Sequence, residues 1–152
     1  MTIVADAKWL NEREMRAWQG FLAAGALVGR QVEQHLKQEG LSHTQYEVLV
    51  RLAAAPKGQL RMTELADALY TSKSGLNYQV TQMEKTGLVR REACPTDVRG
   101  VIANLTAAGR DLLEQIAPGH VETVRRVLID VLTPEQQQAI AIGLGEVARR
   151  LA

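Results

Sequence analysis

The chain has 152 residues, enough for one ordinary domain with a real core, and its 18 Lys and Arg nearly balance 17 Asp and Glu. Net charge therefore gives no argument for nucleic acid or membrane as a partner, and any such argument must rest on where the charges are placed. The single cysteine, Cys94, excludes an internal disulfide framework.

The start of the chain does not have the pattern of a targeting segment. Asp6, Lys8 and Glu12 interrupt the apolar run that a secretory signal needs, and the longest apolar stretch, around Phe21 to Val28, is too short to cross a bilayer. We expect a cytoplasmic protein with no membrane partner.

Apolar residues recur every three or four positions from Met15 to Leu36, which predicts a long amphipathic helix that ends at Gly40. Ser42 and Gln45 then have the spacing of a capping box, so a second helix should run from residue 43 to about 55. A turn follows, and residues 59–61 are long enough only for a very short strand.

Two short helices meeting at a tight turn are predicted next, the first over residues 62–69 and the second capped by Thr71 or Ser72 and ending before Gly87. Residues 86–106 set two β-prone stretches around a Pro-Thr-Asp-Val-Arg-Gly turn, which predicts a hairpin.

The rest of the chain is predicted to be helical. One pattern begins at Thr106 and continues through Val131, with a kink expected at Pro118. A last helix is predicted to begin after Thr133 and to reach the end of the sequence. Pro134 stands at its first position, and Gln136, three residues after Thr133, completes a capping box.

The predicted helix over residues 71–86 has one face made almost wholly of hydrogen-bonding groups. If Leu76, Val80 and Met83 are buried, helical periodicity puts these polar side chains together on the other side. Such groups suit base edges and phosphates, and the start of the helix offers unpaired N–H groups to a phosphate. The predicted DNA-binding residues of this segment are Ser72, Lys73, Ser74, Asn77, Tyr78, Thr81, Gln82 and Lys85.

The hairpin carries more arginine than its turn requires. Arg99 at the tip is predicted to enter the minor groove, with Asp97 fixing its rotamer, and Arg90 and Arg91 at the base are predicted to contact phosphates. Two short helices and this hairpin together predict a winged helix-turn-helix, in a fold that is mainly α with a small β-hairpin wing.

The sequence resembles the MarR family of bacterial transcription regulators over nearly its whole length. The segments that carry the resemblance are, in order, LSHTQYEVLVRLAAAPKGQLRMTELADAL, SKSGLNYQVTQMEKTGLVRRE, CPTDVRGVIANLTAAGRDLL and LTPEQQQAI. The Asp-x-Arg wing followed by the Leu-Thr-x-x-Gly helix start is fairly specific to this family.

The resemblance implies that the chain has two functional regions. Residues 41–106 would form the winged helix-turn-helix DNA-binding domain, and residues 8–39 and 107–152 a helical dimerisation region. The homodimer would bind a pseudo-palindromic operator in double-stranded DNA, most often as a repressor. A small aromatic or lipophilic effector would bind between the two parts, where Trp18, Phe21 and Tyr46 are candidates for its pocket, although aromatic residues at helical spacing are more often core.

The sequence is also compatible with two functions other than effector-controlled DNA binding. A winged helix can serve as a protein-interaction module without binding DNA, and Cys94 raises the possibility of a redox switch, although no second cysteine is present to resolve a sulfenic acid. The three histidines lie far apart in the sequence, and no phosphate-binding loop or metal motif is present. We therefore expect no enzyme activity, no metal and no cofactor.

Overall fold

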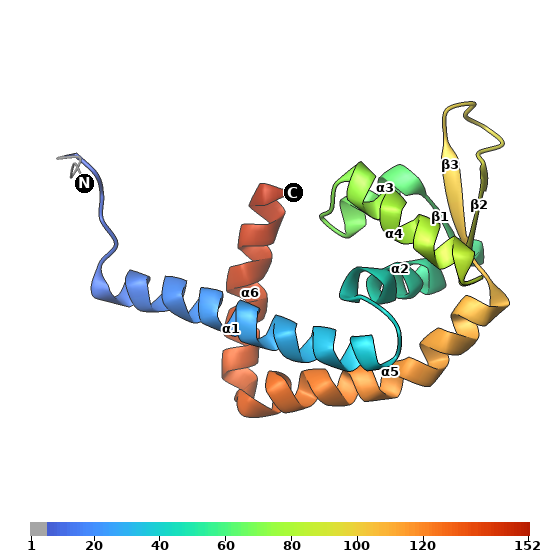
Figure 1. The fold of residues 1–152 in the computed structure, drawn as a ribbon. Coiled ribbons are helices and arrows are strands. Elements are labelled where there is room, and N and C mark those ends of the chain that lie inside the picture. Colours follow the sequence, from blue (N-terminus) through green and yellow to red (C-terminus); the bar gives the residue numbers. More distant parts are fainter. Residues whose placement is uncertain (1–5) are drawn as a thin grey trace.

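The computed structural model describes residues 6–152; residues 1–5, part of the stretch in which no secretory signal is expected, lie outside the described residues. The fold is mainly helical with one small sheet (Figure 1). In chain order the elements are α1 (Glu12–Gln38), α2 (His43–Ala54), the 3-10 turn η1 (Pro56–Gly58), β1 (Gln59–Arg61), α3 (Met62–Ala68), α4 (Lys73–Lys85), β2 (Val89–Ala93), β3 (Val101–Leu105), α5 (Ala107–Val127), η2 (Ile129–Val131) and α6 (Pro134–Leu151).

The sheet has three antiparallel strands in the order β1-β3-β2. The predicted hairpin is its β2–β3 pair, with Val89 opposite Leu105 and Ala93 opposite Val101. The predicted short strand, β1, adds to the other side of β3, with Gln59 opposite Asn104. The hairpin therefore extends from a sheet whose other edge is tied to the start of α3.

The hydrophobic core lies where α2, α3 and α4 meet this sheet. Fully buried side chains come from each helix, including Leu49 and Leu52 of α2, Leu65 of α3 and Val80 of α4. Burial of such side chains is the main source of stability in a domain of this size. The same core includes Leu36, from the last turns of α1.

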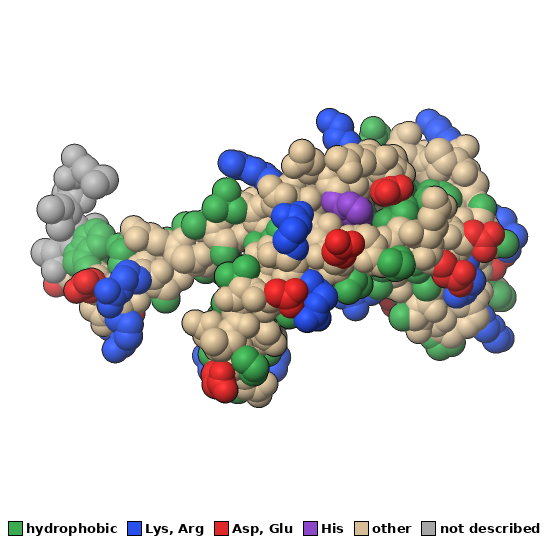
Figure 2. Space-filling model, turned by 90° about the horizontal axis from the view of Figure 1, so that it is seen from below, with side chains coloured by type: hydrophobic (Ala, Val, Ile, Leu, Met, Phe, Trp, Pro, Cys, Tyr) green, Lys and Arg blue, Asp and Glu red, His purple; other side chains and the backbone are tan. Residues whose placement is uncertain are grey.

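The long helices α1 and α5 lie side by side beneath this core, and α6 crosses α1 away from it (Figure 1). The first half of α1 and most of α6 remain exposed, including large apolar side chains such as Trp18, Phe21 and Leu144. Figure 2 shows hydrophobic side chains along the arm formed by α1 and on the projecting α6. This apolar surface is uncovered in the single chain.

Helix starts follow local sequence signals. The capping boxes predicted at Ser42 and Thr133 are both present, with the side-chain oxygen accepting the N–H of Gln45 at 3.1 Å and of Gln136 at 3.2 Å. A third box, at Asn11, begins α1 three residues before the predicted Met15. Each box satisfies backbone donors that the first turn of a helix leaves unpaired.

Two features of α5 bear on the sequence predictions. The helix continues through Pro118, which removes one backbone N–H, and Figure 1 shows that it bends along its length. The prediction that it continues through Val131 is wrong, because α5 ends at Val127 and Leu128 leaves the helical region at φ −134°. Ile129–Val131 form the separate 3-10 helix η2, whose tighter turn follows the break at Leu128.

Within residues 6–152, no helix is both long enough and apolar enough to cross a membrane.

Candidate nucleic-acid interface

Helix α4 has the two faces that its sequence predicts. Leu76, Val80 and Met83 are all at most 1% exposed and anchor the helix in the core. Ser72 caps the first turn by accepting the Gly75 N–H at 3.0 Å. The other face is lined by the predicted DNA-binding side chains, all of which are at least partly exposed: Ser72, Lys73, Ser74, Asn77, Tyr78, Thr81, Gln82 and Lys85.

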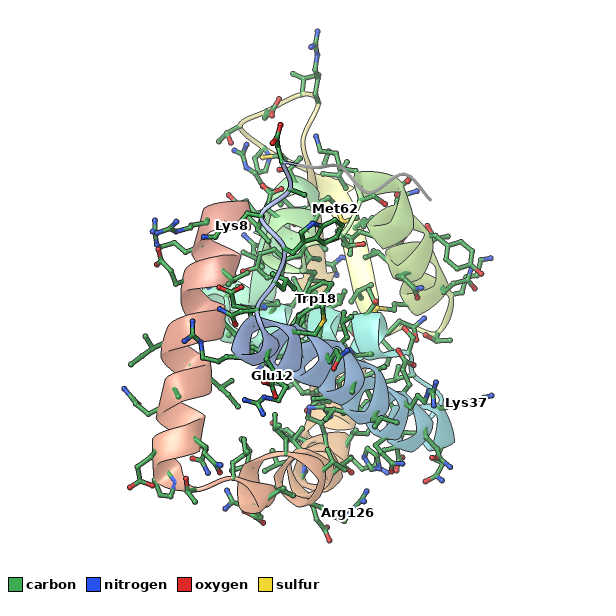
Figure 3. The ribbon with its side chains drawn as sticks, turned by 90° about the vertical axis from the view of Figure 1, so that its left-hand side faces the viewer. Lys8, Glu12, Trp18, Lys37, Met62 and Arg126 are labelled. Atoms are coloured by element: carbon green, nitrogen blue, oxygen red, sulfur yellow. The ribbon has the colours of Figure 1, made fainter. Side chains whose placement is uncertain are left out.

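The wing is a tight, closed turn. Cys94 donates its N–H to the Gly100 carbonyl at 2.9 Å, and Gly100 donates to the Asp97 carbonyl at 3.0 Å. A Cβ at Gly100 would lie only 2.9 Å from the Cβ of Cys94, so glycine permits the close approach of the two strands. Figure 3 shows the wing standing clear of the helices, with its tip pointing away from the body of the molecule.

Asp97 contacts Arg99 differently from the prediction. Its carboxylate accepts the backbone N–H of Arg99 at 3.0 Å and so shapes the turn, while its other oxygen faces the guanidinium of Arg61 at 3.7 Å. The Arg99 side chain is exposed at the tip. A cation there is available to a polyanion outside the molecule.

Arg61 is a wing contact that sequence reasoning missed. It stands at the cap position of α3 without making a cap hydrogen bond. Its guanidinium instead donates to Thr96 Oγ1 at 3.2 Å and faces Asp97. Arg61 and the wing turn are more than thirty positions apart in the sequence, so no local pattern signals the pair.

The two arginines at the base of the wing differ. Arg90 is 68% exposed and faces Glu92 at 3.8 Å. Arg91 is 22% exposed and turns onto α4, where it donates to Glu84 Oε1 at 2.6 Å, to Thr81 Oγ1 at 2.9 Å and to Asn77 Oδ1. The structure thus brings three of the predicted DNA-binding residues together, but as partners of one another.

The three candidates for an effector pocket do not share one cavity in the described chain. Trp18 and Phe21 are about half exposed and stack with ring centroids 6.2 Å apart. Phe21 lines an apolar cleft of about 560 Å³ between α1 and α6, together with Val28, Ile140 and Leu144. In Figure 3, α6 stands beside α1, on which Trp18 is labelled.

Tyr46, by contrast, is buried and packs against His120, with ring centroids 4.3 Å apart and the ring planes tilted by 37°. This contact belongs to a histidine cluster at the junction of α1, α2 and α5. Burial lowers the pKa of His120, and nearby His43 and His35 lower it further against an opposing effect of Glu47. The fold therefore gathers histidines that lie far apart in the sequence. Within residues 6–152, however, no group of three or more His, Cys, Asp or Glu could hold a metal ion.

Cys94 lies at the inner side of the wing and is only 7% exposed. Its Sγ is 3.4 Å from Thr96 Oγ1. Hydrogen bonding to the side chain and backbone of Thr96 lowers the pKa of the thiol, helped by the charge of Arg61. A sensor thiol must also be accessible to the oxidant, and burial here works against that role.

A short helix, a turn, a polar-faced helix seated on the core and an arginine-bearing hairpin define a winged helix-turn-helix transcription regulator.

Comparison with known proteins gives the family. The MarR family profile matches residues 39–100. The crystal structure of AbsC, a MarR family transcriptional regulator from Streptomyces coelicolor, is 40% identical, with a TM-score of 0.91 over 95% of this chain and 98% of that one. The chain belongs to the MarR family and is a DNA-binding transcription regulator, not an enzyme.

Two further relatives bear on how such a regulator works. Sco3205, a MarR family regulator from Streptomyces coelicolor whose structure was solved in complex with DNA, is 41% identical with a TM-score of 0.91, over 95% of this chain and 94% of that one. The transcriptional repressor YetL of Bacillus subtilis is 27% identical over 80% of this chain and 72% of its own.

Proposed function

We propose that this chain is a homodimeric repressor that binds a pseudo-palindromic operator and releases it when a small aromatic or lipophilic effector binds. The observation that carries the proposal is the juxtaposition of the polar face of α4 with an arginine-bearing wing. A regulator of this kind acts where bacterial chromosomal DNA lies, in the cytoplasm.

In the proposed complex, α4 enters the major groove and the wing reaches the adjacent minor groove. Lys73 and the exposed N–H groups of the first turn of α4 bind a phosphate, and Lys85 and Arg90 bind others. Arg99 enters the minor groove, where narrow A·T-rich stretches attract guanidinium groups. That the similar regulator Sco3205 was solved in complex with DNA supports DNA binding by this chain.

The DNA-binding test compares Arg99→Ala with Gln82→Ala on a duplex obtained by in vitro selection and on a scrambled duplex. Loss of Arg99 removes one cation from each half-site, so the slope of log affinity against log salt should become shallower by up to about 1.8 per dimer on both duplexes. Loss of Gln82 removes base contacts without changing charge, so it should cost about 1 to 3 kcal/mol on the selected duplex and little on the scrambled one.

Intact folding of both variants is checked by circular dichroism. If neither folded variant changes operator binding, the wing and α4 do not read DNA. That result would favour the alternative of a winged-helix interaction module. A redox switch through Cys94 is the less favoured alternative, because the thiol is buried.

The dimer is proposed from the uncovered apolar face of α1 and α6. Met15, Trp18 and Leu22 of α1 and Leu144 and Val147 of α6 are each at least 40% exposed. Contiguous apolar surface of this kind marks interaction sites in water-soluble proteins. A symmetric dimer would present two copies of α4 at the spacing of successive major grooves, about 34 to 36 Å. Sedimentation equilibrium at low micromolar concentration should show a dimer, and a stable monomer would contradict the proposal.

The effector proposal rests on the cleft beside Phe21, which has the size and apolar lining of a small-molecule site. Because the cleft lies on the proposed dimer face, a molecule wedged there would alter the spacing of the two α4 helices. A coupling of about 1 to 3 kcal/mol is enough to weaken operator binding measurably. A compound screen should find ligands that raise the melting temperature and lower operator affinity together, and Phe21→Ala should abolish both effects.

Repression, as opposed to activation, is proposed because the relative YetL is named as a transcriptional repressor. A repressor blocks transcription by occupying its operator, so a reporter gene placed behind the selected duplex should be less active when the protein is present. Increased reporter activity would instead show an activator.

A further inference from the structure

Arg91 forms a network with one stripe of α4. Its three guanidinium nitrogens reach Asn77, Thr81 and Glu84, which follow one another along the helix at spacings of four and three residues. The backbone N–H of Arg91 also donates to Glu84 Oε2 at 3.2 Å. Side chains at this spacing lie on one line of the helix surface, so a single planar fork from β2 spans two turns of α4.

The network provides hydrogen-bond partners for the hydroxyl of Thr81 and for one of the two polar side-chain atoms of Asn77, its oxygen. Thr81 Oγ1 donates to the Asn77 carbonyl at 2.8 Å and accepts from Arg91 at 2.9 Å. Asn77 Oδ1 accepts from Arg91. An asparagine recognises adenine by using its oxygen and its amide together, and the hydrogen bond from Arg91 occupies one of the two lone pairs of that oxygen and directs the amide of Asn77 toward β2.

The charge of Arg91 is also compensated. Glu84 Oε1 lies 2.6 Å from Arg91 and both side chains are largely covered, at 22% and 31% exposed. A guanidinium whose donors are already engaged with a carboxylate has little to offer a phosphate. Arg90, the next residue on the strand and 68% exposed, keeps that ability.

Two other large polar side chains remain on this face of α4. Within residues 6–152, the side-chain atoms of Tyr78 and Gln82 form no hydrogen bond, although the backbone carbonyl of Gln82 accepts from Thr86 Oγ1 at 3.4 Å. Tyr78 is 62% exposed. A glutamine can contact adenine through both its amide atoms, as an asparagine does.

We propose that Arg91 is a positioning residue, which fixes the base of the wing on α4 and withholds Asn77 and Thr81 from the bases, so that Tyr78 and Gln82 read the sequence. The inference rests on the proposed DNA binding and changes the expected role of Arg91 from a phosphate contact to an internal clamp.

The test uses Arg91→Lys, which keeps the charge but not the planar fork, with Arg90→Lys and Arg90→Ala as matched controls on the same strand. Operator and scrambled-duplex affinities are measured across a salt series for each variant. A phosphate contact tolerates lysine, whereas a clamp that needs three directed donors does not. Arg91→Lys should therefore lower the ratio of operator to scrambled affinity by about 5- to 150-fold, the range of one lost base contact, with the salt slope unchanged.

The controls should behave in the opposite way. Arg90→Lys keeps the charge of this phosphate contact, so it should change the affinities for the two duplexes equally and leave their ratio the same. Arg90→Ala should make the slope shallower by up to about 1.8 per dimer and leave the affinity ratio unchanged. A charge-neutral double variant, Arg91→Ala with Glu84→Gln, serves as a second probe and should lower the ratio without changing the slope.

Each result has a definite consequence. An Arg91→Lys variant with the wild-type ratio overturns the inference, as does a double variant whose salt slope becomes shallower like that of Arg90→Ala. In both cases the proposed DNA binding stands, because the wild type and Arg90 variants still show it. A wild-type protein that binds no duplex overturns the proposed function and the inference together.

Discussion

Gly109→Ala should destabilise the protein through one contact at the base of the wing. A Cβ at Gly109 would lie 2.2 Å from the Leu88 carbonyl oxygen and 2.7 Å from Leu105 Cδ1. Real Cβ atoms essentially never come closer than 3.0 Å, so α5 and the wing would have to separate by about 0.8 Å. The same Leu88 oxygen accepts the N–H of Thr106 at 3.2 Å and its hydroxyl at 3.0 Å, so the shift would also disturb the cap of α5.

The magnitude combines three effects. Overpacking costs about 1 to 3 kcal/mol, disturbance of the cap about 1 kcal/mol, and alanine returns up to about 1 kcal/mol through its helix propensity. We expect the free energy of unfolding to fall by about 1 to 3 kcal/mol, because the cap and helix-propensity effects roughly cancel. Urea denaturation followed by circular dichroism measures this, with protomer concentration held constant because assembly shifts apparent stability.

Gly145→Ala is the matched control. Gly145 lies within α6, where an added Cβ meets nothing within 4 Å. It should gain up to about 1 kcal/mol from helix propensity. If Gly109→Ala proved as stable as the wild type while Gly145→Ala behaved as expected, the close approach of Leu88 to α5 would be refuted.

Three further predictions concern stability. Leu52→Ala should cost about 2 to 5 kcal/mol in the same urea assay, because Leu52 is fully buried and its loss leaves a cavity; a loss below 1 kcal/mol would contradict this. Thr133→Ala should cost about 1 kcal/mol by removing the capping box of α6, with Thr133→Ser retaining stability. Burial lowers the pKa of His120 below its ordinary 6.5, so below that pH the unfolded chain binds a proton that the folded chain does not, and stability should fall as pH falls. His120→Asn should flatten this decline between about pH 7 and 5, and an unchanged pH profile would exclude His120 as its source.

Features fixed by neighbouring residues could be predicted from the sequence. The boxes at Ser42 and Thr133 depend only on a hydroxyl and a glutamine three residues later, and both are confirmed. The buried stripe of α4 follows from helical periodicity, and it too is confirmed. The MarR family resemblance is confirmed by relatives that cover nearly the whole chain.

Features that depend on distant pairs could not be predicted. Nothing near Arg61 in the sequence indicates that it will reach Asp97 in the wing turn. Likewise, the periodicity of α4 places Asn77 and Thr81 on an exposed face but does not indicate that Arg91 from β2 will engage them. The roles of the individual DNA-binding residues and the division of the chain into two regions stay predictions.

The strand order β1-β3-β2 has a consequence for how the protein is made. Because β1 pairs with β3, residues 59–61 cannot form their strand hydrogen bonds until residues 102–104 have been synthesised and have left the ribosome. Translation of the intervening helix-turn-helix takes on the order of seconds, and during that time β1 presents an unpaired edge. Truncation of the message before β3 would leave that edge permanently open, so such fragments should aggregate or be degraded, whereas chains that extend past Leu105 can close the sheet during synthesis.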